Sequence, residues 1–257
     1  MSVGAIGSSY ASAYSSYGTV AAGGKLQNAA QDAAGLAIEQ KTETQTKGLD
    51  QGTENLKMGK SALNVEDGAL EGIQDYLTSI KELAIKANNA TLSDEDKGYI
   101  QGQINQYLQG IDDLAKGTTF NEKKLLDGSN GDMSIASDGN GGTAKVSTYD
   151  STVASLGLSG FDVTSGNADL SAIDNALKTV QDSRTSVGAE TNRIDFAANY
   201  NSKASLELNG YSMDREEDRV MNALQDIKKK QALDQYQMML QKKQQDDEAQ
   251  KSQMFFA

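Results

Sequence analysis

Cysteine, histidine, tryptophan and proline are all absent from this 257-residue chain. Without cysteine and histidine the chain cannot form a disulfide, a zinc or iron–sulfur site of the usual kind, or a Ser-His or Cys-His nucleophile pair. Without proline the main residue that interrupts helices is missing, which favours long helices. We therefore expect no catalytic residue, no cofactor and no metal site, and a protein that is not an enzyme.

A positive net charge and long apolar runs are also missing. The formal net charge is −12, which argues against binding to nucleic acid or to anionic lipid, because both require clustered Lys and Arg. No apolar run approaches the roughly 20 residues that span a membrane. The N-terminus has no basic segment followed by a continuous apolar one, so any export is expected to proceed without a cleaved signal peptide.

Sites made of carboxylates alone remain chemically possible, because acidic residues cluster at 94–96, 112–113 and 246–248. Nothing in the sequence surrounds these clusters with convergent ligands, so solvated helix ends and faces are the better interpretation. The glycine-rich stretch 139–142 is not followed by the Lys-Ser/Thr pair of a phosphate-binding loop. We interpret it as a turn.

A seven-residue repeat of apolar side chains organises residues 55–90, with a second series three residues after the first. This spacing predicts a helix with an a/d seam. Ala69, Tyr76 and Leu83 widen the apolar face, which favours a bundle of several helices over a two-stranded coil. A single amphipathic helix in a globular core is the alternative. The seam of this helix comprises Leu56, Leu63, Leu70, Ile73, Leu77 and Ile80.

Three further segments have helical spacing. Residues 26–39 are Ala-rich and should lead into the seam helix. Residues 100–114 carry a second apolar stripe after an N-cap at Ser93, and their short connection predicts an antiparallel helix that ends at a Gly117 C-cap. Apolar spacing resumes at residue 170, where Arg184 and Thr191 occupy seam positions and need polar partners. The seam of this last helix comprises Ile173, Val180, Val187 and Ile194.

The ends of the chain and the segment 129–166 have a different composition. Residues 1–24 are uncharged and rich in Gly, Ala, Ser and Tyr, and either a flexible arm or a helix that forms in an assembly fits them. Residues 129–166 are rich in Gly, Asn and Asp with short alternating pieces, which predicts a β-hairpin. Residues 213–257 form a thin apolar stripe that needs a partner surface. We expect both ends to be mobile in the monomer.

The expected fold is mainly α, an elongated antiparallel helical bundle or coiled-coil rod with one small β-hairpin region. The expected parts are an N-terminal arm at 1–40 that orders on assembly, rod helices at 41–128, a hairpin with loops at 129–166, a return helix at 167–208 and a C-terminal arm at 209–257.

Four motifs occur in an order that resembles bacterial flagellin: NAAQDAAGLAIEQK, SIKELAIKANN, IDDLAKGTTFNEKKLLDG and VGAETNRIDF. The resemblance covers roughly Leu26 to Ala198, and both terminal arms depart from the family pattern. It implies a secreted, self-assembling subunit of the extracellular bacterial flagellum that serves motility. It also implies an export chaperone and cap or junction proteins as partners. The outer domains of larger flagellins are expected to be absent.

Two alternatives remain open: a minor protein at the junction of hook and filament, and a secreted helical adhesin that does not polymerise. The resemblance further implies that SIKELAIKANN contacts the Toll-like receptor for flagellin. Ser79 replaces a usual arginine and Gln103 a usual glutamate, so receptor binding is expected to be weak. The expected receptor or lateral contact surface comprises Ser79, Lys81, Glu82, Leu83 and Gln103.

Overall fold

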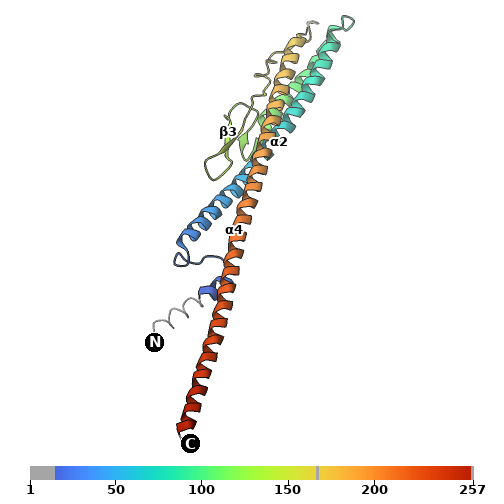
Figure 1. The fold of residues 1–257 in the computed structure, drawn as a ribbon. Coiled ribbons are helices and arrows are strands. Elements are labelled where there is room, and N and C mark those ends of the chain that lie inside the picture. Colours follow the sequence, from blue (N-terminus) through green and yellow to red (C-terminus); the bar gives the residue numbers. More distant parts are fainter. Residues whose placement is uncertain (1–14, 166–167, 256–257) are drawn as a thin grey trace. The chain divides into compact units, whose positions relative to one another are not determined.

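Long helices dominate the computed structural model, which describes residues 15–165 and 168–255. The mainly α fold is confirmed (Figure 1). The chain divides into two compact units, a middle unit of residues 47–204 and a terminal unit formed by the residues before 47 and after 204. The elements are α2 (Ala33–Ala87), α3 (Asp94–Gly117), β1 (Thr119–Phe120), β2 (Lys123–Lys124), β3 (Met133–Ala136), β4 (Thr143–Val146) and α4 (Leu170–Phe255).

Helix α2 begins later than its composition suggests. A helix from residue 26 was expected, but residues 25–32 are not helical and the helix begins at Ala33. Asp32 sets this start, because its Oδ1 accepts a hydrogen bond of 2.8 Å from the backbone N–H of Gly35. A carboxylate in this position satisfies an amide that has no partner within the first turn of the helix.

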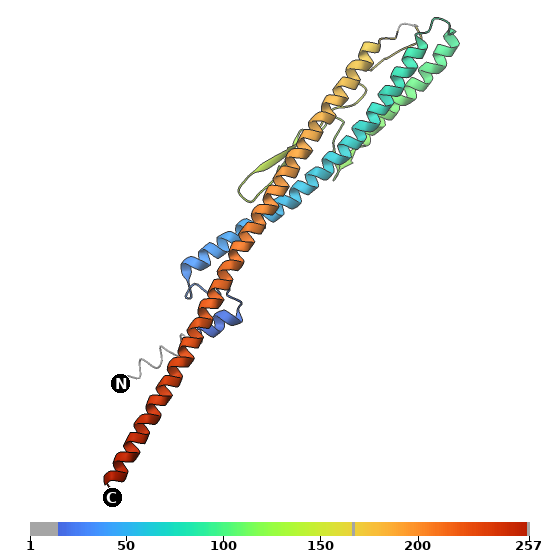
Figure 2. The same ribbon diagram turned by 45° about the vertical axis from the view of Figure 1, so that its right-hand side comes forward.

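Helix α3 runs antiparallel to α2 within the middle unit (Figure 2). Its predicted start is confirmed, because the Ser93 side chain accepts from the backbone N–H of Asp96 and the Asp96 carboxylate accepts from the backbone N–H of Ser93. The expected Gly117 C-cap is wrong. Gly117 is the last helical residue and Thr118 is the C-cap, whose backbone N–H and hydroxyl both donate to the carbonyl oxygen of Leu114.

Two small antiparallel hairpins follow α3. The shorter one, β1 with β2, was not expected from the sequence, and its turn is formed by Asn121 and Glu122 with φ of 48° and 66°. Positive φ at both central residues matches the twist of two adjoining strands, but it usually requires Gly at one of them. The expected hairpin is β3 with β4, paired from Met133 with Val146 to Ala136 with Thr143.

The end of the β3–β4 hairpin lies directly on helices α2 and α4. The side-chain amide of Asn55 on α2 donates to the carbonyl oxygen of Ala136 at 3.1 Å, and that of Asn201 on α4 donates to the carbonyl oxygen of Ser137 at 2.6 Å. Gly52 of α2 lies so close to Ser137 that a Cβ atom there would overlap its carbonyl group. The hairpin is thereby fixed to both helices.

Helix α4 is one continuous helix, without a break at the expected boundary between residues 208 and 209. At the other end of the chain, residues 15–21 are helical and Tyr17 is 53% exposed. Residues 1–14, for which a flexible arm or a helix was expected, lie outside the described residues.

Candidate functional site

The two predicted seams lie in the hydrophobic core of the middle unit. Their ten residues, six from α2 and four from α4, are each at most 1% exposed. Glu66 occupies the same series, because it lies seven residues before Ile73, and its side chain is 0% exposed. Sequence reasoning passed over this carboxylate, although the spacing was available to find it.

Three of the five residues of the expected contact surface share one face of α2. Successive helical residues are about 100° apart, so Ser79, Glu82 and Leu83 lie within roughly 100° of one another around the helix axis. Lys81 lies on another side of α2, where its Nζ binds Oδ1 of Asp174 on α4 at 2.6 Å. The structure therefore separates Lys81 from the other α2 residues of this surface.

The shared face is partly tied to the protein itself. The hydroxyl of Ser79 donates to the backbone carbonyl of Asp75 at 3.0 Å, and Leu83 is half-buried against the core. Glu82 is exposed. The face therefore presents a short hydroxyl, a carboxylate and the remaining surface of one leucine.

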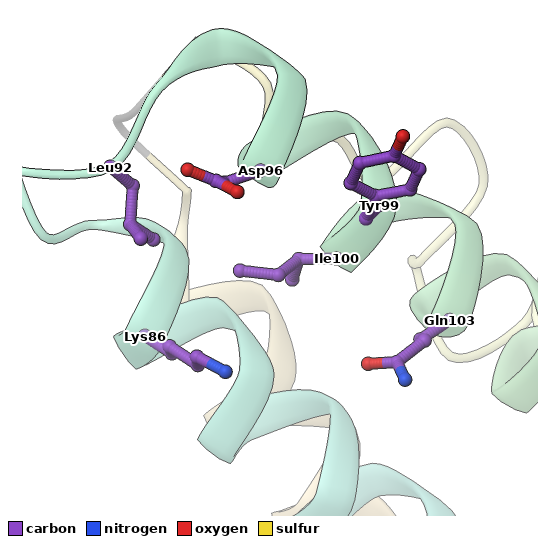
Figure 3. Close-up of a pocket in the computed structure, with 6 residues that line it drawn as sticks. All are labelled: Lys86, Leu92, Asp96, Tyr99, Ile100 and Gln103. Atoms are coloured by element: carbon purple, nitrogen blue, oxygen red, sulfur yellow. The ribbon is translucent and has the colours of Figure 1, made fainter.

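Gln103, the fifth residue, lies on α3 and lines an open hollow of about 470 Å³ between the ends of α2 and α3 (Figure 3). Lys86, from the same face of α2 as Ser79, lies across the hollow from Gln103. Leu92 and Ile100 supply the apolar part of the lining, and Tyr99 is 69% exposed at its rim. This combination of apolar floor and polar rim suits contact with another protein.

Asp96 places a negative charge at the rim of the hollow, and hydrogen bonds hold its carboxylate in position. The hydroxyl and backbone N–H of Ser93 both donate to the Asp96 carboxylate, at 2.7 and 3.2 Å, and these bonds hold its pKa below the usual value. Asp96 therefore stays ionised at the N-terminus of α3, where a negative charge is favourable. Within residues 15–165 and 168–255, no three acidic side chains converge in a way that could hold a metal ion.

A second candidate surface lies in the terminal unit, where Arg219 of α4 binds two residues that precede residue 47. Arg219 donates from Nε to the carbonyl oxygen of Gly24 at 2.5 Å and from Nη2 to Glu39 at 3.2 Å. Residues 231–251 are all exposed. The large apolar side chains of α4 that are exposed beyond this anchor are Met221, Leu224, Leu233, Tyr236, Met238, Met239 and Leu240.

Comparison with known proteins assigns the chain to a family. Residues 5–131 match the model of the bacterial flagellin N-terminal helical region. The flagellar filament 30.7 kDa core protein of Treponema maltophilum is 30% identical over 201 residues, which cover 70% of each chain. This chain belongs to the bacterial flagellin family. The flagellin of Halalkalibacterium halodurans is 29% identical over 195 residues, which cover 74% of this chain and 72% of that flagellin.

Longer flagellins match over part of their length only. The flagellin of Salmonella berta is 35% identical over 179 residues, and the match covers 68% of this chain but 35% of that flagellin. The expectation of a short flagellin, without the outer domains of larger members, is thus confirmed. As a flagellin, the chain is a structural subunit of the extracellular flagellar filament. Within the described part of the chain, no helix is long and apolar enough to cross a membrane.

Solved structures agree with the fold. The crystal structure of Bacillus cereus flagellin has a TM-score of 0.52 and 27% identity, and it covers 58% of this chain and 88% of that one. A putative flagellar hook-associated protein from Vibrio parahaemolyticus has a TM-score of 0.59 at 15% identity, and it covers 73% of this chain and all of that one. At that identity the likeness concerns the fold alone and does not favour the junction-protein alternative.

Proposed function

We propose that this flagellin polymerises through the part of α4 beyond its anchor at Arg219. The observation that carries the proposal is that Leu233, Tyr236 and Leu240 are 42–59% exposed, in a segment of α4, residues 231–251, that is exposed throughout. Their spacing of three and four residues places them on one face of α4. Such a stripe is stabilised when a neighbouring subunit covers it, because apolar surface is then removed from water.

Electron microscopy of the purified protein under polymerising conditions tests this proposal. We expect filaments from the wild type and none from the variant Leu233→Glu with Tyr236→Glu, which places two charges on the stripe. The matched control is Gln231→Glu with Gln235→Glu, which adds the same charge on the opposite face of the same helix. Filaments from both variants, or from neither, would contradict the assigned face.

The terminal segments are proposed to order when subunits assemble. Residues 231–251 are exposed along their whole length, whereas the middle unit has a buried core. Limited trypsin digestion should therefore cut the isolated monomer first at Lys228–Lys230 and Lys242–Lys243, and the assembled filament should protect these sites. A monomer whose C-terminal segment resists trypsin as well as α2 does would refute this part of the proposal.

Further partners come from the family resemblance and remain proposals: an export chaperone, cap and junction proteins, and weak binding to the Toll-like receptor at the surface around Ser79 and Gln103. The proposed role is mechanical and involves no catalytic step. Export is proposed to occur without cleavage of a signal peptide. Mass spectrometry of filament protein checks this, since removal of an N-terminal segment of signal-peptide length would contradict it.

A further inference from the structure

Glu66 lies in the middle of an apolar helix face. It lies on the seam of α2, seven residues before Ile73. Ile80 and Ala87 follow at the same spacing, and Ile73, Ile80 and Ala87 are all 0% exposed. Glu66 is itself 0% exposed. A carboxylate in such a position is costly, because ionised groups lose their hydration when they are buried.

Neither carboxylate oxygen of Glu66 has a hydrogen-bond partner among the described residues. This distinguishes Glu66 from the acids around it. Glu190 on α4 accepts hydrogen bonds from the backbone N–H and the hydroxyl of Ser147, at 2.9 and 2.5 Å. Asp132, just before β3, binds Lys145 of β4 at 2.7 Å.

The charges that face Glu66 from the surrounding elements do not compensate it. Glu190 from α4, Asp132 from the segment before β3 and Asp67 from α2 are all negative. Lys145 is paired with Asp132, and Arg184 is paired with Asp67. Burial above all, and then these three negative charges, raise the pKa of Glu66 to about 8.

We propose that Glu66 is a proton-binding switch, uncharged in the folded protein at neutral pH, whose ionisation at higher pH loosens the β3–β4 hairpin from α2 and α4. The coupling runs through Glu190. A negative charge on Glu66 repels the carboxylate that holds Ser147, the residue immediately after β4. The switch belongs to the subunit itself and does not depend on polymerisation.

The direction of the pH dependence follows from the raised pKa. In the unfolded chain Glu66 returns to its ordinary pKa of 4.5, whereas in the folded protein the pKa is about 8. Between these values the folded state holds a proton that the unfolded state has released, so stability falls as the pH rises. The stability that the folded state gains from the bound proton of Glu66 is fully present below pH 4.5 and is lost as the pH rises to about 8.

Urea unfolding of the full chain, followed by circular dichroism between pH 5.5 and 8.5, tests the switch. The ratio of the unfolding equilibrium constant of the wild type to that of Glu66→Gln should rise about tenfold per pH unit up to pH 7.5, or about 100-fold over two units, and should then level off. Glu54→Gln, an exposed change on the same helix, is the control and should give a flat ratio.

Carbon-13 NMR of the wild type makes the test independent of any variant that fails to fold. The Glu66 carboxyl should titrate near pH 8, and the Ser147 amide should exchange faster with solvent, beyond the ordinary base dependence of exchange, as Glu66 ionises. A Glu66 titration near pH 4.5, or a ratio for Glu66→Gln that does not change with pH, would overturn the proposal.

Discussion

Arg184 on α4 binds Asp67 on α2 across 117 residues of sequence, with 2.9 Å between Nε and Oδ1. Its Nη1 also donates to Gln74 at 3.2 Å, and Glu71 lies 3.5 Å from Nη2. The expectation that Arg184 requires polar partners in its seam position is confirmed. The contact ties α4 and α2 together at a point where the apolar seam is interrupted.

Replacing this arginine should weaken the middle unit moderately. We predict that Arg184→Gln lowers the free energy of unfolding by about 1 to 2 kcal/mol, because several charge-assisted hydrogen bonds are lost at a site that is only partly screened by water. Lys178→Gln breaks an ion pair whose side chains are 73% and 68% exposed, and it should change stability by less than about 0.5 kcal/mol. Urea unfolding of the two variants checks this prediction. Equal losses of stability would contradict the stabilising role assigned to Arg184.

Leu77 tests the seam of α2 directly. Its side chain is 0% exposed, so Leu77→Asp buries an unpaired charge, and we predict a loss of about 3 to 5 kcal/mol. Thr78→Asp adds the same group at the next residue, which is exposed, and should change stability by about 0.5 kcal/mol or less. Thermal unfolding followed by circular dichroism separates the two. Similar melting shifts would mean that the seam is assigned to the wrong face.

The proposed receptor surface predicts a gain of function. Ser79→Arg with Gln103→Glu restores two charged groups, and a hydrogen bond to a charged group contributes roughly 1.5 to 3 kcal/mol. We therefore expect the double variant to act in a receptor reporter-cell assay at about tenfold lower concentration than the wild type. Ser61→Arg with Gln109→Glu places the same charges elsewhere on α2 and α3 and should give no gain. Unchanged potency of the first variant would refute the proposal.

The features that sequence reasoning found are local ones. The seams follow from a repeat of seven residues, and the start of α3 follows from Ser93 and Asp96, which lie within one turn. The features that sequence reasoning missed depend on single side chains or on partners far away in the sequence. The β1–β2 turn holds Glu122 at positive φ without a glycine, and Asp32 delays the start of α2.

Glu66 was missed for a different reason. A carboxylate normally marks the exposed face of a helix, so its seam spacing relative to Ile73 was overlooked. Two of the charges that raise its pKa, Asp132 before β3 and Glu190 on α4, lie at least 66 residues further along the chain. Periodicity in α2 can identify such a position, but only the packing of distant segments determines whether the position is closed to water.

The close approach of the β3–β4 hairpin to α2 makes two glycines of the same helix behave in opposite ways. A Cβ atom at Gly52 would overlap the carbonyl group of Ser137, whereas nothing lies within 4 Å of a Cβ atom at Gly68. We predict that Gly52→Ala costs about 1 to 3 kcal/mol through overpacking. Gly68→Ala should gain about 0.5 to 1 kcal/mol, because alanine restricts the unfolded chain and favours a helix.

Urea unfolding compares the two alanine variants, and backbone NMR shifts of residues 135–142 report on the hairpin itself. Only Gly52→Ala should shift these signals, because the amides of Asn55 and Asn201 hold the hairpin in the place that the new methyl group would occupy. A stabilising effect of equal size at both positions would show that the hairpin does not press on α2. In that case the two amide contacts alone would have to account for its position.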